Sequence, residues 1–229
     1  MAQGSTLWLT LTIGAYAAGV TLQRLCGRHP TLNPTLIAII IVATALYFRH
    51  IDYSIYSGAV QPIHLLLGPA VVALAVPLYR NIGLARERAA LLVAALLVGC
   101  VTAIIGSTVA GRLFGLPPAD LLSLAPKSAT TAVSMAIAAK IGGIPAVTAV
   151  LTILTGITGA VVAPFVLNAL RIHDPVARGF GMGLASHGIA TARAFQESET
   201  TGAFSGLAMA LNAVATAVLT PLLVRLLAH

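Results

Sequence analysis

Long apolar runs fill this chain and constrain its fold more than any other feature. Crossing the hydrocarbon layer of a bilayer, about 30 Å thick, takes about 20 residues at 1.5 Å per residue. Eight candidate helical segments are joined by short connections: residues 6–25, 33–48, 61–79, 89–111, 120–140, 145–170, 180–196 and 201–227. We therefore expect an all-α polytopic membrane protein of about seven to eight hydrophobic segments, forming a single integral membrane domain over residues 1–229.

The composition supports this class and excludes others. Hydrophobic residues make up 58% of the chain and charged residues only 8%, whereas soluble domains carry roughly 25% charged residues. The net charge of +7 comes from cations between apolar runs, which is typical of membrane topology signals. We expect a lipid bilayer around the protein, and no nucleic-acid partner.

The sequence offers little chemistry for an enzyme. The HExxH and GxSxG motifs are absent, and the short connections leave no room for a soluble catalytic domain. Cys26 and Cys100 lie far apart without a CxxC pattern or nearby histidine ligands. We interpret them as packing residues and expect no enzyme activity, cofactor or metal site.

Three segments carry residues that interrupt a helix. Residues 61–79 contain Gly68 and Pro69, residues 120–140 contain Pro126, and residues 180–196 contain Gly188. Interrupted backbone at membrane depth is tolerated only where it is buried in protein or lines a wet cavity. We therefore predict helix breaks at Gly68, Pro69, Pro126 and Gly188.

The distribution of cations predicts how these segments cross the membrane. If residues 120–140 re-enter on the side from which they came, the 171–178 loop lies inside and Arg225 also ends inside. The loop with Glu197 and Glu199 then lies outside. This arrangement satisfies the positive-inside bias at almost every loop, so we predict a re-entrant segment near 120–140.

The same topology predicts inverted repeats. Residues 30–113 and 142–227 would each form three segments that begin on opposite sides of the membrane, and each half would contain an interrupted helix. Inverted-topology repeats place a substrate site at the midplane between paired broken helices. We expect such paired broken or re-entrant helices here.

The stretch around Pro126 is the strongest local signal for binding. A cation and hydroxyls at a helix N-terminus form a site for anions, because free amides and the helix dipole point at the ligand. The candidate residues are Lys127, Ser128, Thr130 and Thr131. In the alternative interpretation, Lys127 snorkels to the interface and the hydroxyls bond the carbonyls four residues earlier.

A second polar cluster lies in residues 180–196. Polar residues at membrane depth are functional candidates by default; here they are Ser186, His187, Thr191 and Arg193. Alternatively, Arg193 pairs with Glu197, or His187 is a hydrogen-bonded core residue that serves no substrate. We interpret Asn212 as a packing residue; alternatively, it satisfies a neighbouring backbone group or contacts substrate. All six acids lie near segment ends, which does not favour Na⁺ as the substrate.

Several spaced motifs together resemble the LrgB/CidB family of bacterial membrane proteins. They are Pro126-Lys127-Ser128 with Thr130-Thr131, Gly142-Gly143-Ile144-Pro145, Leu154-Thr155-Gly156, and Ala185-Ser186-His187-Gly188-Ile189 with Thr191-Ala192-Arg193 and Gly202-Ala203-Phe204. The resemblance implies a multi-pass protein of the bacterial inner membrane with a small LrgA/CidA-type membrane protein as partner. Plastid relatives move glycolate and glycerate, some bacterial relatives are linked to pyruvate uptake, and older descriptions are holin-like or antiholin-like.

Two functional hypotheses follow. The first is a secondary transporter that carries small monocarboxylates or 2-hydroxycarboxylates, of the glycolate, glycerate, pyruvate or lactate type, by alternating access. Lys127 and Arg193 would attract the anion, the hydroxyls would bond its oxygens, and His187 would bond substrate or carry a proton. The second is a holin-like or antiholin-like protein that regulates murein hydrolase activity and cell lysis. A homodimer is compatible with either.

Overall fold

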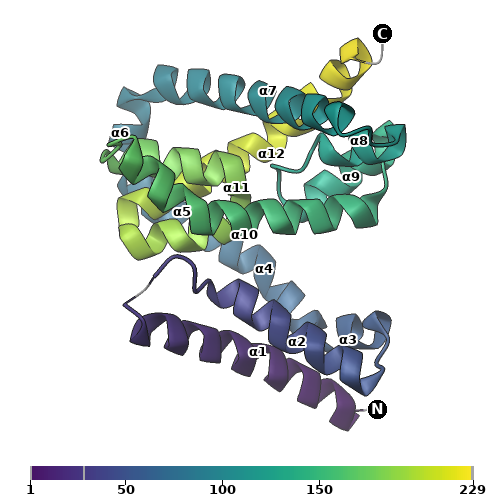
Figure 1. Ribbon diagram of the computed structural model, residues 1–229. Helices are drawn as coiled ribbons and strands as arrows, with labels where there is room; N and C mark the ends of the chain where they lie inside the picture. Colours follow the sequence, from purple (N-terminus) through teal and green to yellow (C-terminus); the bar gives the residue numbers. More distant parts are fainter. Residues whose placement is uncertain (1, 28, 228–229) are drawn as a thin grey trace. The chain divides into compact units, whose positions relative to one another are not determined.

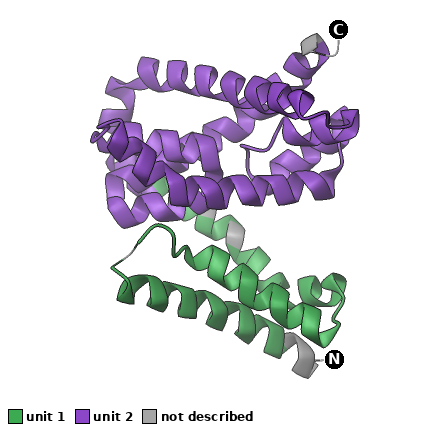
Figure 2. Cartoon of the chain, in the orientation of Figure 1, with its two compact units in different colours: residues 1–75 green, residues 76–229 purple. Residues whose placement is uncertain are grey.

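The regular secondary structure of the described residues is α-helical. The computed structural model describes residues 2–27 and 29–227, and the regular elements within them are α-helices (Figure 1). Four stretches are long and apolar enough to cross a membrane: Gln61–Arg80, Ala89–Leu113, Pro145–Ala169 and Glu199–Arg225. The expected all-α polytopic membrane protein is therefore confirmed. Two compact units make up the chain, Met1–Ala75 and Val76–His229 (Figure 2).

The first unit contains four helices: α1 (Ala2–Leu25), α2 (Pro34–Arg49), α3 (Tyr53–Ala59) and α4 (Gln61–Ala73). Helix α2 begins at Pro34 because the Asn33 side chain accepts hydrogen bonds from the next free amides, and proline suits the first helical position. Helices α1 and α2 run antiparallel, side by side (Figure 1). Trp8 of α1 packs edge-on against Tyr56 of α3, with ring centroids 6.2 Å apart.

The structure corrects the position of one expected break. Helix α4 continues through Gly68 and Pro69, and the interruption comes at Leu74, just before α5 (Ala75–Arg80). A proline inside a helix removes one hydrogen bond and bends the helix, but the turns on either side can hold it together. The interruption of this segment therefore lies at Leu74 and not at Gly68–Pro69.

The second unit is built on three long helices. They are α7 (Ala89–Leu113), α10 (Pro145–Ala169) and α12 (Glu199–Leu227), and the short α6 (Ile82–Glu87) precedes them. At 1.5 Å per residue each is about 37 Å or longer, enough to cross a bilayer. Helices α7 and α12 pack in parallel, because Leu92 lies near Phe204 and Ile104 lies near Leu219.

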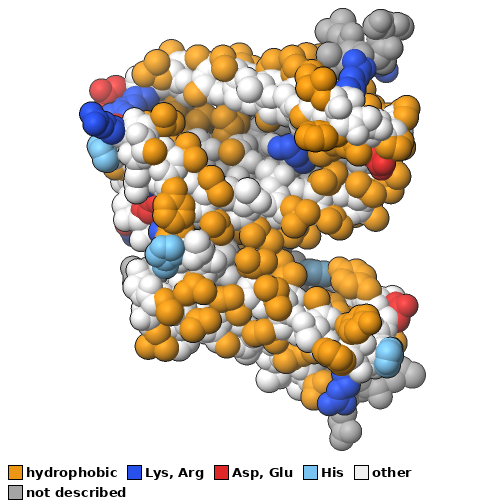
Figure 3. All heavy atoms as spheres, in the orientation of Figure 1, with side chains coloured by type: hydrophobic (Ala, Val, Ile, Leu, Met, Phe, Trp, Pro, Cys, Tyr) orange, Lys and Arg blue, Asp and Glu red, His pale blue; other side chains and the backbone are white. Residues whose placement is uncertain are grey.

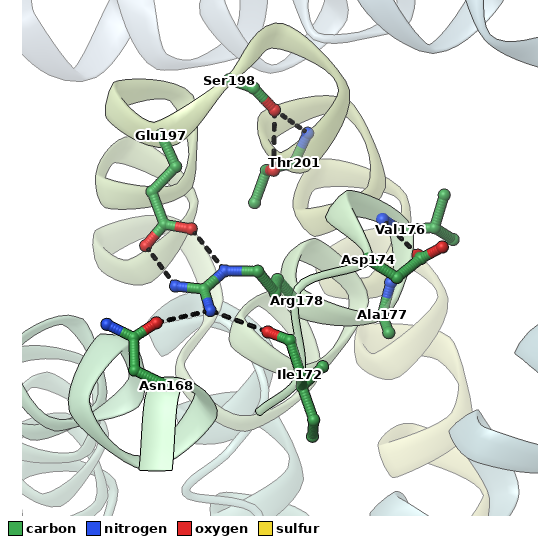
Figure 4. Close-up of polar contacts among 9 residues, drawn as sticks. All are labelled: Asn168, Ile172, Asp174, Val176, Ala177, Arg178, Glu197, Ser198 and Thr201. Atoms are coloured by element: carbon green, nitrogen blue, oxygen red, sulfur yellow. Dashed lines mark hydrogen bonds and ion pairs between the residues drawn. The ribbon is translucent and has the colours of Figure 1, made fainter. Parts of the chain in front are cut away.

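Helix α11 (Pro175–Glu197) is a hairpin, and its turn lies directly before the break that the sequence predicted at Gly188. Its backbone leaves the helical region at Ser186 (φ −143°, ψ 20°) and His187 (φ 43°, ψ −140°). Arg178 near its start donates to Glu197 at its end, with Nε to Oε2 at 2.8 Å and Nη2 to Oε1 at 3.1 Å (Figure 4). In a straight helix these residues would be about 28 Å apart, so α11 enters the unit and returns to the same end.

Ionic contacts gather at the base of this hairpin. Arg178 also donates to Asn168 Oδ1 and to the Ile172 carbonyl, both at 2.9 Å (Figure 4). Two further ion pairs join Arg88 to Asp174 at 2.7 Å and Arg80 to Glu199 at 3.1 Å. Residues 80–88, 168–178 and 197–200 therefore lie together, and we call this part of the second unit the ionic end.

This arrangement corrects the expected topology of the last loops. The 171–178 loop and the loop with Glu197 and Glu199 lie at the same end, whereas the cation distribution predicted opposite sides. Arg225 lies at the other end of α12 from Glu199. The physical reason is the turn at Ser186–His187. A segment that turns back does not cross the membrane, so the loop after it lies on the same side as the loop before it.

A second hairpin begins at the opposite end of the unit. Helices α8 (Pro118–Leu124) and α9 (Thr131–Ile141) are separated by non-helical residues 125–130. Near its base, Leu121 of α8 lies against Gly111 in the last turn of α7. The Ile144 amide, after α9, donates to Ser123 Oγ at 2.7 Å. The segment in which we predict re-entry is therefore a hairpin with its tip near Pro126.

A hairpin followed by a long helix occurs twice in this unit, and the two copies run in opposite directions. Residues 118–169 enter from one end and residues 175–227 from the ionic end. These bounds differ from the halves 30–113 and 142–227, of which the first spans parts of both compact units. The repeat of those halves and the single domain over 1–229 stay predictions.

Candidate functional site

The tips of the two hairpins meet at the middle of α12. Asn212 Nδ2 donates to the Ser128 carbonyl at 2.8 Å and to the Leu184 carbonyl at 3.1 Å. Both carbonyls belong to interrupted backbone, where a regular helical partner is missing. Thr216 Oγ1 donates to Asn212 Oδ1 at 3.2 Å and lies 3.4 Å from Cys100 Sγ. Asn212 is therefore the clamp between the tips, and of the alternatives given for it, satisfaction of backbone groups is the one that the structure shows.

A cavity of about 730 Å³, which we call the central cavity, opens beside the two tips. Figure 3 shows this face of the second unit hollowed between α7 and α10. Its lining comes from α7, the 125–130 tip, α10 and α11: Gly99, Thr102, Ala103, Lys127, Ser128, Leu151, Leu154, Thr155, Thr158, Gly159, Val162, Ala163, Val166, Leu184, Ala185 and Ser186. Lys127 is the only charged residue among these.

Lys127 lies near the middle of the long helices and not near their ends. Ala125, two residues earlier, packs against Cys100 and Ile104 in the middle of α7. Within residues 2–27 and 29–227, no carboxylate forms an ion pair with Lys127. This position does not match a lysine that snorkels to the interface. It leaves one positive charge beside an apolar cavity, where electrostatic attraction is stronger than in water.

Two glycines of α10 make room for the α11 tip. A Cβ on Gly159 would collide with Ser186 Oγ, and a Cβ on Gly156 would lie 2.6 Å from His187 Cε1. The positive φ of 43° at His187 is a conformation that costs a non-glycine residue of order 1–3 kcal/mol. The close fit against α10 holds this strained turn in place.

His187 and Thr191 form a buried polar network behind the central cavity. His187 Nε2 lies 2.9 Å from the Thr152 carbonyl, and because a carbonyl only accepts, Nε2 carries the proton. Thr191 Oγ1 donates to the His187 carbonyl at 2.9 Å and lies 2.9 Å from Ser205 Oγ. His187 is thus a hydrogen-bonded core residue in this conformation, and its role in proton transfer stays a prediction.

Arg193 does not join Lys127. It lies on the second arm of α11, which runs from the tip back to the ionic end, and its Nη1 donates to Gln196 Oε1 at 2.8 Å. Glu197 bonds Arg178, and the alternative pairing of Arg193 with Glu197 stays a prediction. The direction of the second arm separates the two cations that we expected to act together.

The hydroxyls of the 125–130 tip take different positions. Ser128 is buried and lines the central cavity, while Thr130 and Thr131 are half-buried at the start of α9. Thr130 is the N-cap of α9, but its side chain does not bond the free amides. Ser134 Oγ closes the tip by donating to the Pro126 carbonyl at 2.7 Å, eight residues back and not the four of the back-bonding alternative.

One face of α10 belongs to the site although the sequence did not predict it. Thr155, Thr158 and Gly159 line the central cavity, and Thr152 and Gly156 contact His187. Threonine and glycine recur here at spacings of three and four residues, which places them on one helical face. That periodicity is the signal that could have identified α10 as the third wall of the site.

Opposed hairpins that meet beside a lysine-bearing cavity define a polytopic membrane protein with a central polar site. Residues 12–226 match the LrgB-like family, and the chain belongs to this family. It is 36% identical over 218 residues to the uncharacterized protein YxaC of Bacillus subtilis strain 168, covering 94% of each chain. It is 31% identical over 220 residues to the holin-like protein CidB of Staphylococcus aureus strain N315, covering 96% of each.

A further relative, the uncharacterized protein YwbG of Bacillus subtilis strain 168, is 33% identical over 217 residues. It covers 94% of this chain and 95% of its own. No solved structure matches the chain at a significant level. The resemblance to the LrgB/CidB family is confirmed, and the name of the CidB relatives agrees better with the holin-like hypothesis than with the transporter hypothesis.

Proposed function

We propose that this chain carries small organic monocarboxylates across the membrane through the central cavity. The substrate would be of the glycolate, glycerate, pyruvate or lactate type. The observation that supports the proposal is the cavity beside two hairpin tips at mid-depth, with Lys127 as its one charged residue. Hairpins that enter from opposite ends provide two elements that could open in turn, as alternating access requires.

The lining residues suit an anion with one charge. The Lys127 ammonium would neutralise the carboxylate, and the hydroxyls of Ser128, Ser186, Thr155 and Thr158 can donate to its oxygens. The Thr155 hydroxyl already donates to the Leu151 carbonyl, so it would have to release that bond to donate to substrate. The remaining lining side chains are apolar or small and leave a second charge without a partner. The absence of an acid among these lining residues does not favour a metal cation as substrate.

Uptake of labelled glycolate or pyruvate into proteoliposomes tests the proposal. We expect saturable uptake that Lys127→Ala abolishes, because the only charge in the cavity is removed. Lys140→Ala is the matched control: it removes the same charge from an exposed position on α9 and should transport like wild type. Normal uptake by Lys127→Ala, or no uptake by wild type with or without a partner protein, would contradict the proposal.

A holin-like function is the second candidate, and the names of the CidB relatives favour it. Under this hypothesis the chain oligomerises and controls cell lysis, and the hairpin tips serve packing. Solute size separates the two candidates. A holin-like oligomer should release large dyes without saturation, whereas a carrier should exclude dyes and saturate with carboxylate.

Location and partners complete the proposal. We place the chain in the bacterial inner membrane, in keeping with its spans and its bacterial relatives. A small LrgA/CidA-type membrane protein is the proposed partner, and a homodimer is a further possibility for assembly. Co-purification of the two proteins from membranes, with transport measured for each alone and for both together, tests this part.

A further inference from the structure

Leu184 lies at the boundary between two cavities. It lines the central cavity and also a smaller cavity of about 250 Å³ between α7 and α11. The smaller cavity extends to Arg88, whose guanidinium bonds Asp174 at the ionic end. We call it the end cavity. Leu184 is thus the one residue that both linings share.

The two cavities follow the same face of α7. Arg88, Leu92 and Ala95 line the end cavity, and Gly99 and Thr102 line the central cavity. Spacings of three and four residues place these five positions on one side of the helix. The two cavities are therefore neighbours along α7, and joined they would form one path from the ionic end to the middle of the unit.

Leu184 closes this path where it crosses Gly99. Its side chain lies against the α7 backbone, so that a Cβ on Gly99 would collide with Leu184 Cδ2. Because Gly99 has no side chain, the Leu184 methyl groups can contact the α7 backbone directly. The side chain therefore lies between Ala95, which lines the end cavity, and Thr102, which lines the central cavity.

The same residue is mechanically linked to the site. The Leu184 carbonyl accepts from Asn212, and the same amide group donates to Ser128, which is next to Lys127. An anion that binds at Lys127 and Ser128 would act on the tip that shares this clamp. Movement of either tip would therefore shift Leu184 against α7.

We propose that Leu184 is the gate residue between the ionic end and the central cavity. This inference rests on the proposed carrier function, because it assigns Leu184 to the path by which the organic anion reaches Lys127 from one side. Displacement of the leucine from Gly99 joins the two cavities, and its return separates them.

Reaction of introduced cysteines with a charged, membrane-impermeant thiosulfonate tests the gate without any transport measurement. The background is Cys26→Ser with Cys100→Ser, which keeps a hydroxyl beside Thr216. Ala95→Cys reports the end cavity, Thr102→Cys reports the central cavity, and Val98→Cys, which is 67% exposed on α7 but lines neither cavity, reports the lipid-facing surface. The reagent is added from the side of the ionic end.

We expect Ala95→Cys to react readily, Val98→Cys not at all, and Thr102→Cys slowly. Adding Leu184→Ala should accelerate the Thr102→Cys reaction at least about tenfold, which corresponds to roughly 1.4 kcal/mol in the opening equilibrium. Leu184→Val should give a smaller acceleration and tests the same effect with less loss of packing. Leu207→Ala, a truncation in the same apolar cluster, should leave the rate unchanged.

A Thr102→Cys rate that Leu184→Ala and Leu184→Val both leave unchanged would overturn the gate, and so would an equal acceleration by Leu207→Ala. These outcomes differ from failure of the carrier function. If the labelling pattern is as expected but no carboxylate is taken up, the path and its gate stand and the proposed substrate is wrong.

Discussion

Replacement of Asn212 by leucine is the sharpest test of how the hairpin tips are held. The substitution keeps a side chain of similar size at a position that is only 1% exposed. It removes the amide that donates to the Ser128 and Leu184 carbonyls, and the oxygen that accepts from Thr216. The Ser128 carbonyl, which is buried, and the Leu184 carbonyl, which is partly buried, then lose a donor.

The expected loss follows from these two carbonyls. A buried acceptor left without its donor costs about 1–3 kcal/mol, which gives about 2–6 kcal/mol for the pair. Interhelical hydrogen bonds in membranes average only about 0.6 kcal/mol, because the groups find other partners. The tips can relax in the same way, so we expect Asn212→Leu to lower the free energy of unfolding by about 2 kcal/mol.

Unfolding of the purified protein in mixed micelles, followed by helix content, measures this difference. Thr220→Val is the matched control, because Thr220 is equally buried on the same helix and its hydroxyl has no hydrogen-bond partner within the described residues. Its replacement should be neutral or slightly stabilising. An Asn212→Leu variant within about 0.5 kcal/mol of wild type, the range of ordinary surface changes, would refute the clamp.

Two further predictions concern the α11 hairpin and the ion pair at its base. Gly159→Ala should displace Ser186, lower the melting temperature and reduce carboxylate uptake, whereas Gly106→Ala, which has no atoms within 4 Å of the added methyl group, should match wild type in both assays. Hydrogen bonding from Arg88 is the main cause that lowers the pKa of Asp174. The ionised Asp174 carboxylate therefore contributes to stability above its unfolded pKa of about 3.9, and this contribution is lost as the pH falls through the lower folded pKa. Thermal melts should therefore show wild type more stable than Asp174→Asn at pH 7 by less than about 1 kcal/mol, because the pair is largely exposed. This difference should shrink as the pH is lowered toward 2, and a difference that stays unchanged over that range would contradict the reasoning.

The sequence predicted features that depend on local chemistry. Apolar runs identified the long helices α7, α10 and α12, because length and hydropathy alone decide which segments can cross a bilayer. Proline marked the tip at Pro126, and the break in α11 lies at Ser186–His187, directly before the expected Gly188. The convergence of Lys127, Ser128 and Ser186 on one cavity also followed from these breaks.

Features that depend on distant partners could not be predicted in this way. The return of α11 is visible in the pairing of Arg178 with Glu197, and nothing in the local pattern distinguishes that hairpin from a single span. The same turn directs Arg193 away from Lys127. The continuity of α4 through Pro69 is a similar case, because a proline bends a helix without always ending it.

Ligand-induced stabilisation tests the central claim most directly, namely that Lys127 at the meeting of two hairpins binds a small organic anion. A ligand that binds only the folded state at 100 times its Kd adds about 2.7 kcal/mol to its stability. Glycolate should raise the melting temperature of the wild-type protein in a saturable way, but should not raise that of Lys127→Ala, and uncharged ethylene glycol should have no effect. Equal stabilisation of both proteins by glycolate, or no stabilisation of wild type by any short carboxylate, would contradict the account.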